Sequence, residues 1–401
     1  MNGYHRSGCT LCPGLKLISG KLNFRFVSHI GQLNTFIRIK ISAFTLGVYL
    51  LSGVFQLEAQ VLQDTTALKL VKETVDQMYN MRFSDAGETC NKIREKYPEH
   101  PVGFLLRGMI IYWENYPLMS GSGAGRGFEY QMRLCIDKCE DFKPENEAEI
   151  LLTNLCARGS LLAFYSGNDL NSKAFSLGRT TYRYLRRSFK FVGTFPDFYF
   201  FTGLYNYYRE AYPDAHPAYR PLFAVFPRGN RVKGMQELRT AFKESIFLKA
   251  EASTFLSSNY KYFENDFVNA SYFSRTIYHE YPRNIVYRIN CIEDQLLIGK
   301  YDEAEKLINS VNSNNRYYQA QLTILRGILN EKKYSDMNKA EQEYFRGIEN
   351  LSEYSSYGEQ YAAYAWFGLS RISGFNSDRH NQRIYRRKAL DLTSFGNVNF
   401  D

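Results

Sequence analysis

The sequence has few of the patterns from which catalytic and metal sites are built. Its 401 residues include only six histidines, and no two of them lie three or four positions apart, so no helix can present a two-histidine metal site. Neither a GxSxG nor an HExxH motif occurs. The glycine-rich segment SGSGAGRG (120–127) lacks the Lys and the Ser or Thr of a phosphate-binding loop. We therefore expect no catalytic residues, no cofactor, no metal ion and no enzymatic activity.

Cysteine is also scarce, and its spacing forms no recognisable framework. Cys9 and Cys12 make a CxxC motif, but no second pair follows at a spacing that suits zinc. The remaining cysteines lie beyond residue 60, and helix packing is the simplest explanation for them. A disulfide between Cys135 or Cys139 and Cys156 stays open, because such bonds form in oxidising compartments.

The net charge of +9 is concentrated near the N-terminus. Residues 1–60 contain six basic residues against one acidic residue, a balance of +5, which leaves +4 for the remaining chain. A balance of +4 is too weak for a nucleic-acid footprint, so no nucleic-acid partner is expected. Basic residues cluster at 183–190 and at 379–388, where they form either solvated helix faces or a docking patch for an acidic partner or a membrane surface.

The N-terminal segment suggests export. An uncharged apolar run, ISAFTLGVYLLSGVFQL (41–57), follows two basic residues and precedes the small residue Ala59. Such an order of basic, apolar and small residues is typical of a secretory signal. We predict a signal peptide at 36–60, preceded by an extension at 1–35. The protein would then be periplasmic or associated with the cell envelope; the alternative is an anchor in the inner membrane through 41–57.

Beyond the leader, apolar residues recur every three to four positions, which indicates successive amphipathic helices. The segment FSDAGETCNKIREKYP (83–98) aligns without a gap with FVNASYFSRTIYHEYP (267–282), and both end in Tyr-Pro. A third copy begins with YDEAEKLI, and a weaker fourth follows it. The alanine of the last three copies recurs at a spacing of about 34 residues, the tetratricopeptide length. These alanines are Ala270, Ala304 and Ala340.

These patterns have a physical basis in helix packing. A small alanine lets the second helix of a hairpin lie close to the first, and the proline after the tyrosine ends the helix. The partner helices carry a glycine within an apolar stretch, at a cost of about 1 kcal/mol relative to alanine, which suggests close contact with a neighbouring helix. These glycines are Gly108, Gly159, Gly203, Gly327 and Gly368.

The chain thereby resembles the tetratricopeptide repeat (TPR) family, clearly at 65–101 and 248–350 and in degenerate form between them. The segment around FPDFYFFTGLYNYYREAYP is similar to exported bacterial repeat proteins. The resemblance implies an all-α fold, an α-α superhelix of stacked antiparallel helix hairpins. We assign 61–401 to one TPR-like helical array, with a Pro-rich insertion at 210–230 and a capping helix near 378–392.

The stretch DFYFFTGLYNYYREAY (197–212) is dense in Phe and Tyr. On a helix its rings form two adjacent apolar stripes, so most rings are expected in the core, with one or two tyrosine hydroxyls facing the groove. The Pro-rich insertion that follows is not expected to form regular helix. The candidate partner-binding residues are Tyr199, Asn206, His216, Tyr219, Arg220 and Arg228.

The favoured function is that of an exported, non-catalytic scaffold that binds a protein or peptide partner through its concave groove. The first helix of each hairpin would offer side chains to an extended ligand. The alternative is a helical carbohydrate-binding protein or glycan-processing enzyme that uses exposed tyrosines. Several coplanar, exposed tyrosine rings around one pocket would favour the sugar, and a long polar groove would favour a polypeptide.

Overall fold

The computed structural model describes residues 61, 64–142, 147–393 and 395–401, all within one compact unit, Ala59–Asp401. The predicted signal peptide or anchor at 36–60, the extension at 1–35 and the CxxC motif lie outside the described residues. No helix in the described part of the chain combines the length and the apolar character that a membrane span requires.

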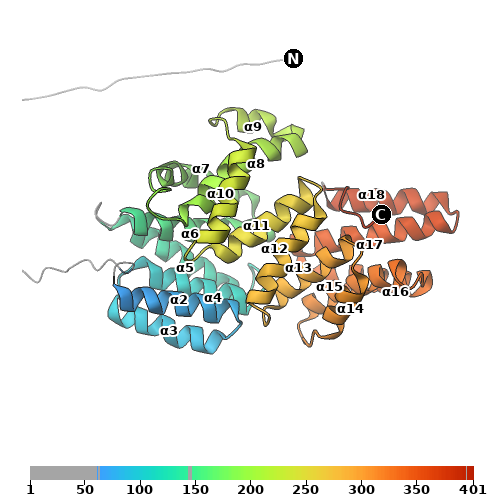
Figure 1. Cartoon of the computed structure of the whole chain (residues 1–401), viewed down its shortest axis with the longest axis horizontal. Coiled ribbons are helices and arrows are strands. Elements are labelled where there is room, and N and C mark those ends of the chain that lie inside the picture. The colour runs from blue at the N-terminus through green and yellow to red at the C-terminus, as the bar shows by residue number, and fades with distance from the viewer. Residues whose placement is uncertain (1–60, 62–63, 143–146, 394) are drawn as a thin grey trace, which may run out of the picture. The chain divides into compact units, whose positions relative to one another are not determined.

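The described residues form α-helices that pack in consecutive pairs, and they contain no strand, so the predicted all-α fold is confirmed (Figure 1). The pairs are α2 (Thr65–Tyr79) with α3 (Phe83–Lys96), α4 (Pro101–Glu114) with α5 (Gly123–Glu140), α6 (Glu147–Gly167) with α7 (Asn171–Ser188), α8 (Phe198–Ala215) with α10 (Arg231–Glu244), α11 (Lys249–Tyr262) with α12 (Phe267–Glu280), α13 (Ile285–Leu297) with α14 (Tyr301–Asn309), α15 (Arg316–Lys332) with α16 (Met337–Leu351), and α17 (Ser356–Phe375) with α18 (Arg379–Leu392). The short helices are η2 (Pro217–Tyr219), α9 (Arg220–Ala224) and η3 (Ser352–Tyr354).

Local sequence explains where these helices begin and end. Asp and Asn side chains cap several N-termini by accepting from backbone N–H groups; Asp64 does so for α2 and Asn284 for α13. Helices α3 and α12 both end directly before a Tyr-Pro pair, as the repeated ending predicts. The repeat alanines Ala86, Ala270, Ala304 and Ala340 are all completely buried.

Close helix contact at the mid-helix glycines is confirmed except at one position. A Cβ atom added at Gly203 would lie 2.9 Å from Leu238 Cγ, so α8 and α10 can approach each other only because residue 203 has no side chain. Added Cβ atoms would also clash at Gly108, Gly327 and Gly368. For Gly159 the prediction is wrong, because this residue is exposed and a Cβ there would meet nothing within 4 Å.

The pairs do not contact their sequence neighbours alone. Tyr79, at the end of α2, packs on Tyr281 and Tyr287 at ring-centroid distances of 5.3 and 6.1 Å. The Asn284 side chain donates to the Tyr79 carbonyl oxygen at 3.1 Å. The first pair therefore packs against α12 and α13, as Figure 1 also shows. A stack of repeats with nearest-neighbour contacts alone would lack this junction.

Further contacts connect the loops after α4 and α6 to the last helices. Tyr116, which follows α4, packs on Tyr317 of α15 and on Tyr357 of α17. The hydroxyls of Ser355 and Ser356 donate to Asp169, which follows α6. In the described chain, the side of the array formed by the first helices is thus partly enclosed.

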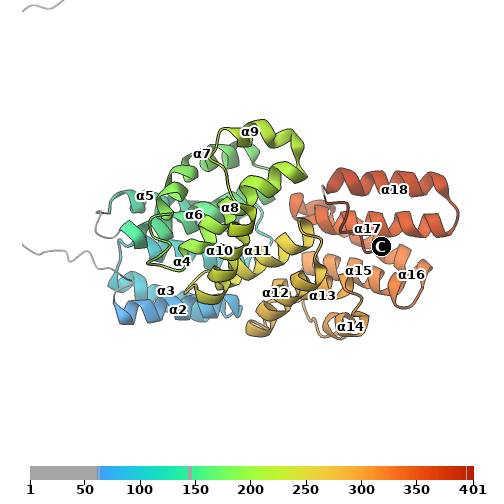
Figure 2. The same ribbon diagram turned by 45° about the horizontal axis from the view of Figure 1, so that its top comes forward.

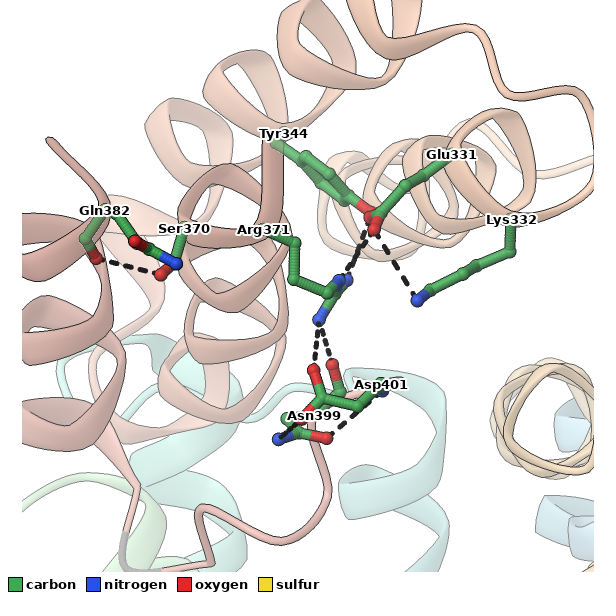
Figure 3. Close-up of polar contacts among 8 residues, drawn as sticks. All are labelled: Glu331, Lys332, Tyr344, Ser370, Arg371, Gln382, Asn399 and Asp401. Carbon is green, nitrogen blue, oxygen red and sulfur yellow. Dashed lines mark hydrogen bonds and ion pairs between the residues drawn. The ribbon is translucent and has the colours of Figure 1, made fainter. Parts of the chain in front are cut away.

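The C-terminal residues return to the array. Helix α18 packs along α17 (Figure 2). It buries Ala389, while its basic side chains are exposed. Val398 and Phe400 are buried, and Phe400 packs edge-on against Tyr364 at 5.0 Å. Arg371 of α17 donates to the Asn399 carbonyl oxygen, which holds the final residues in place (Figure 3).

Candidate functional site

The predicted site residues on α8 face the interior more than solvent. Asn206 is buried, and its side-chain amide donates to Glu237 Oε2 of α10 at 2.7 Å. Tyr199 is partly buried and packs against the core between α6, α8, α10 and α11. Neither side chain extends from the surface in the described structure.

Three tyrosine hydroxyls of the aromatic stretch also form hydrogen bonds within the protein. Tyr207 donates to Glu264, Tyr208 to Asn259 and Tyr205 to the Pro227 carbonyl oxygen, at 2.7, 2.5 and 2.7 Å. These tyrosines therefore connect α8 to the α11–α12 turn and to the insertion.

The candidate residues of the Pro-rich insertion gather only in part. His216 packs on Tyr212 and Tyr219 at centroid distances of 4.4 and 6.3 Å, and partial burial lowers the pKa of His216. Arg220 donates to the Pro213 carbonyl oxygen at 3.2 Å. Arg228 is exposed between α9 and α10. The structure thus brings His216 and Tyr219 together on the surface and leaves Arg228 outside that group.

The insertion is more helical than predicted. Helix α8 continues to Ala215 and includes Pro213, and η2 and α9 follow directly. The expectation that 210–230 has no regular helix is wrong for 210–215, which belong to α8, and for the short helix α9. Pro213 lies in the last turn, where its missing N–H removes a single hydrogen bond.

A cavity of about 290 Å³ lies where the first helices α11, α13, α15 and α17 converge, with α12 and Tyr116 completing its wall. Hydroxyl and amide side chains make up much of its polar lining. They are Thr254, Ser257, Ser258, Ser274, Asn290, Gln321, Ser356 and Gln360. None of the residues singled out from the sequence lines this cavity.

A buried ionic group stands beside the cavity. Lys261 of α11 lies 2.6 Å from Glu293 Oε1 and 2.7 Å from Asp294 Oδ1, and all three side chains are almost completely buried. Ser257 donates to the second Asp294 oxygen at 2.8 Å. Lys261 and Glu293 both line the cavity wall. Two carboxylates on α13 therefore share one lysine.

The pKa shifts follow from this shared burial. Burial alone would lower the pKa of Lys261, but the Asp294 and Glu293 carboxylates outweigh it and raise that pKa well above its usual value. Burial raises the pKa of Asp294, while the neighbouring Lys261 acts in the opposite direction. The lysine is therefore charged at neutral pH.

Tyrosine hydroxyls also donate hydrogen bonds to Glu293. Tyr364 donates to Oε1 at 2.7 Å and Tyr361 to Oε2 at 2.8 Å. Tyr262 lies 3.1 Å from the Tyr364 hydroxyl. Helices α11, α13 and α17 are thus joined by one hydrogen-bonded group, because each contributes side chains to it.

An aromatic cluster forms another part of the wall. Tyr116 stacks on Tyr318 and meets Tyr317 and Tyr357 edge-on, at centroid distances of 6.5, 6.1 and 5.7 Å. Burial raises the pKa of Tyr116 to about 12 and raises those of the other three. These tyrosines are therefore uncharged at neutral pH.

A second glutamate group lies nearby on α15 to α17 (Figure 3). Arg371 donates to both Glu331 oxygens, at 2.6 and 2.8 Å, and Tyr344 donates to Oε2 at 2.6 Å. Lys332 and Asp401 lie at its edge, each 3.7 Å from its nearest charged partner in the group. Glu331 does not line the cavity.

Comparisons with known proteins add little to this description. No family model and no curated protein matches the chain, so membership of the tetratricopeptide family stays a prediction. Among solved structures, the fold is similar to the human IFIT1 dimer with PPP-AAAA, with 11% sequence identity and a TM-score of 0.41. The match covers 78% of this chain and 69% of that one. At this level of similarity the likeness bears on neither ligand nor activity.

Fold and site together define an all-α protein of paired, repeat-like helices with a cavity between its first helices. Its five described cysteines are free thiols, so the disulfide left open for Cys135 or Cys139 with Cys156 is not formed in this structure. The sequence held one signal for the site: the Glu293–Asp294 pair falls within a helix of buried apolar residues, where acidic residues need partners.

Proposed function

We propose that the protein is a non-catalytic scaffold that binds a protein or peptide, and that the cavity between α11, α13, α15 and α17 receives part of that ligand. The observation that carries the proposal is the convergence of side chains from successive first helices on one cavity. Ligand sites in helical proteins commonly lie between helices in this way. A cavity of about 290 Å³ has room for the end of a chain or for one protruding side chain.

The tyrosine rings favour a polypeptide over a sugar stacked on them. Tyr317, Tyr318 and Tyr361 are at most 6% exposed, and their rings pack on each other or on neighbouring aromatic rings. These three tyrosines therefore offer no open, coplanar ring faces on which a sugar could stack. The hydroxyl and amide lining would suit sugar hydroxyls, so a carbohydrate ligand is the second candidate.

Export remains part of the proposal and rests on the leader sequence alone. Expression of the full chain in a Gram-negative host, followed by fractionation and N-terminal sequencing, tests it. A mature start near residue 60 in the periplasmic fraction supports a cleaved signal, and retention of the leader in the membrane fraction supports the anchor through 41–57. A full-length cytoplasmic product contradicts export.

The ligand class is tested with a random peptide library and a glycan panel on one purified sample. We expect peptide binding that is lost in Ser258→Trp, because the indole would occupy the cavity. Ser172→Trp, on the exposed start of α7, is the matched control and should bind as the wild type does. If a glycan binds and Ser258→Trp abolishes that binding, then the ligand is a carbohydrate, the second candidate, and not a peptide. Binding of either ligand that persists in folded Ser258→Trp would contradict a role for the cavity.

A further inference from the structure

The charges beside the cavity do not balance. Two carboxyl groups, those of Glu293 and Asp294, face a single ammonium group, that of Lys261. The other ionisable side chains in the described cavity wall are tyrosines, which burial keeps uncharged. An excess carboxylate in a buried site is costly unless a further positive charge or proton compensates it.

We propose that the cavity binds a primary ammonium group, supplied by the N-terminus or by a lysine side chain of the peptide ligand. This inference rests on the proposed function, since the ammonium group would belong to the bound polypeptide. It commits the site to a second cation, beside Lys261, which is the one basic side chain of the described wall.

The geometry of Glu293 leaves a place for such a group. Among the described residues, Oε1 accepts from Lys261 and Tyr364, whereas Oε2 accepts from Tyr361 alone. A carboxylate oxygen can accept two hydrogen bonds, so Oε2 has one remaining position. Because Glu293 lines the cavity, a ligand ammonium can reach this carboxylate from the cavity side.

The rest of the wall suits an ammonium group as well. Hydroxyl and amide oxygens of Ser258, Asn290 and Gln321 can accept its other N–H bonds. Aromatic faces attract cations, and Tyr262 already lies 5.4 Å from the Lys261 ammonium. A carboxylate ligand would instead meet the excess negative charge of Glu293 and Asp294. The site therefore selects a cation over an anion of the same size.

The first experiment measures binding of n-butylammonium chloride to the full chain by titration calorimetry, with sodium butyrate at equal ionic strength as the anionic counterpart. We expect n-butylammonium to bind and butyrate not to bind. In Glu293→Gln the amine affinity should fall about tenfold or more, the size expected when a charged hydrogen-bond partner is lost. Equal binding of the two probes, or no binding of the amine to the folded wild type, overturns the inference.

The matched control is Glu305→Gln. Glu305 also accepts from a lysine and a tyrosine, Lys333 at 2.7 Å and Tyr334 at 2.6 Å, but it lies outside the cavity. Its variant should bind the amine with wild-type affinity. A similar loss in both variants would mean that the amine binds through general surface charge, which contradicts the site.

The second experiment separates the two sources and the two proposals. Peptides selected from the library are remade with an acetylated N-terminus or with each lysine replaced by norleucine. Loss of affinity on acetylation identifies the N-terminus, and loss on replacement identifies a lysine side chain. If the peptides keep their affinity in both forms, the peptide-binding function stands but the ammonium inference is overturned. If n-butylammonium binds through Glu293 and no peptide does, the ammonium site stands and the peptide function fails.

Discussion

Glu293 on α13 and Glu331 on α15 are buried glutamates with the same kinds of partner but different charge balances. Each accepts a hydrogen bond from at least one tyrosine hydroxyl and from a cation, which is the buried Lys261 for Glu293 and the partly buried Arg371 for Glu331. Each connects a first helix to α17. The difference lies in what surrounds them.

The Glu331 group contains two basic and two acidic side chains, and it is closed in the sense that Glu331 does not line the cavity. Arg371 and Lys332 carry two positive charges against Glu331 and Asp401, and the final residues of the chain pack over Arg371 (Figure 3). The Glu293 group has an excess carboxylate and borders a cavity. Similar residues thus join α15 to α17 in the first case and provide a place for a charged ligand group in the second.

The largest expected effect comes from Arg371→Met. Removal of the guanidinium leaves Glu331 buried without its main partner, which costs about 3–5 kcal/mol in comparable buried pairs. Urea unfolding followed by circular dichroism measures the loss. Arg379→Met, at an exposed arginine on α18, serves as the control and should change stability by less than about 0.5 kcal/mol. A loss below about 1 kcal/mol at Arg371 would contradict the description of a closed group.

Lys261→Met should cost less, about 2–3 kcal/mol, because cavity water can reach Glu293 and because Asp294 can take up a proton. Lys261 normally lowers the pKa of Asp294 against the effect of burial, so this pKa rises further in the variant. A raised carboxyl pKa favours folding below the unfolded value, and this contribution is lost as pH rises through the folded value. The variant should therefore lose more stability at pH 8 than at pH 5, measured against the exposed-site control Lys243→Met. A pH-independent loss would contradict the proposed protonation.

Glu251 extends the comparison to a glutamate without a cation. It lies on α11 and accepts from the Tyr79 hydroxyl, and it makes no ion pair with the described residues. Burial raises the pKa of Glu251 from 4.5 to about 7, with the Tyr79 hydrogen bond acting against it. Between about pH 4.5 and 7, Glu251 therefore keeps its proton in the folded state, whereas it has lost this proton in the unfolded state.

Stability at this site should consequently fall as pH rises from 4.5 to 7 and level off above that range. Glu251→Gln imitates the protonated form. The decrease in stability between pH 4.5 and 7 should therefore be smaller in this variant than in the wild type, by roughly 1–3 kcal/mol. Thermal unfolding of both proteins across this pH range measures the difference. Parallel stability profiles of the two proteins would contradict a raised pKa of Glu251, and Glu251 would then no longer belong in the comparison.

The sequence predicted the helical array better than the site, for a physical reason. Small residues such as Ala270 act within one hairpin, so their spacing carries the information locally. Lys261 is indistinguishable from a solvated lysine until α13 is placed beside it, because its partners lie 32 and 33 positions further along the chain. The prediction for Gly159 shows the opposite error. The local sequence pattern suggested a helix contact there, but the tertiary structure makes none.

The smallest expected effect comes from the removal of one tyrosine hydroxyl from the Glu331 group and one from the Glu293 group. Tyr344→Phe leaves Glu331 Oε2 without a tyrosine donor in a closed group, and we expect a loss of about 1–2 kcal/mol. Tyr361→Phe removes the donor to Glu293 Oε2, where cavity water can take its place, so the loss should stay near about 0.5 kcal/mol. Urea unfolding of both variants under identical conditions gives the two values. Equal losses would show that the cavity does not hydrate Glu293, and the distinction between a closed group and a ligand-accessible one would then no longer hold.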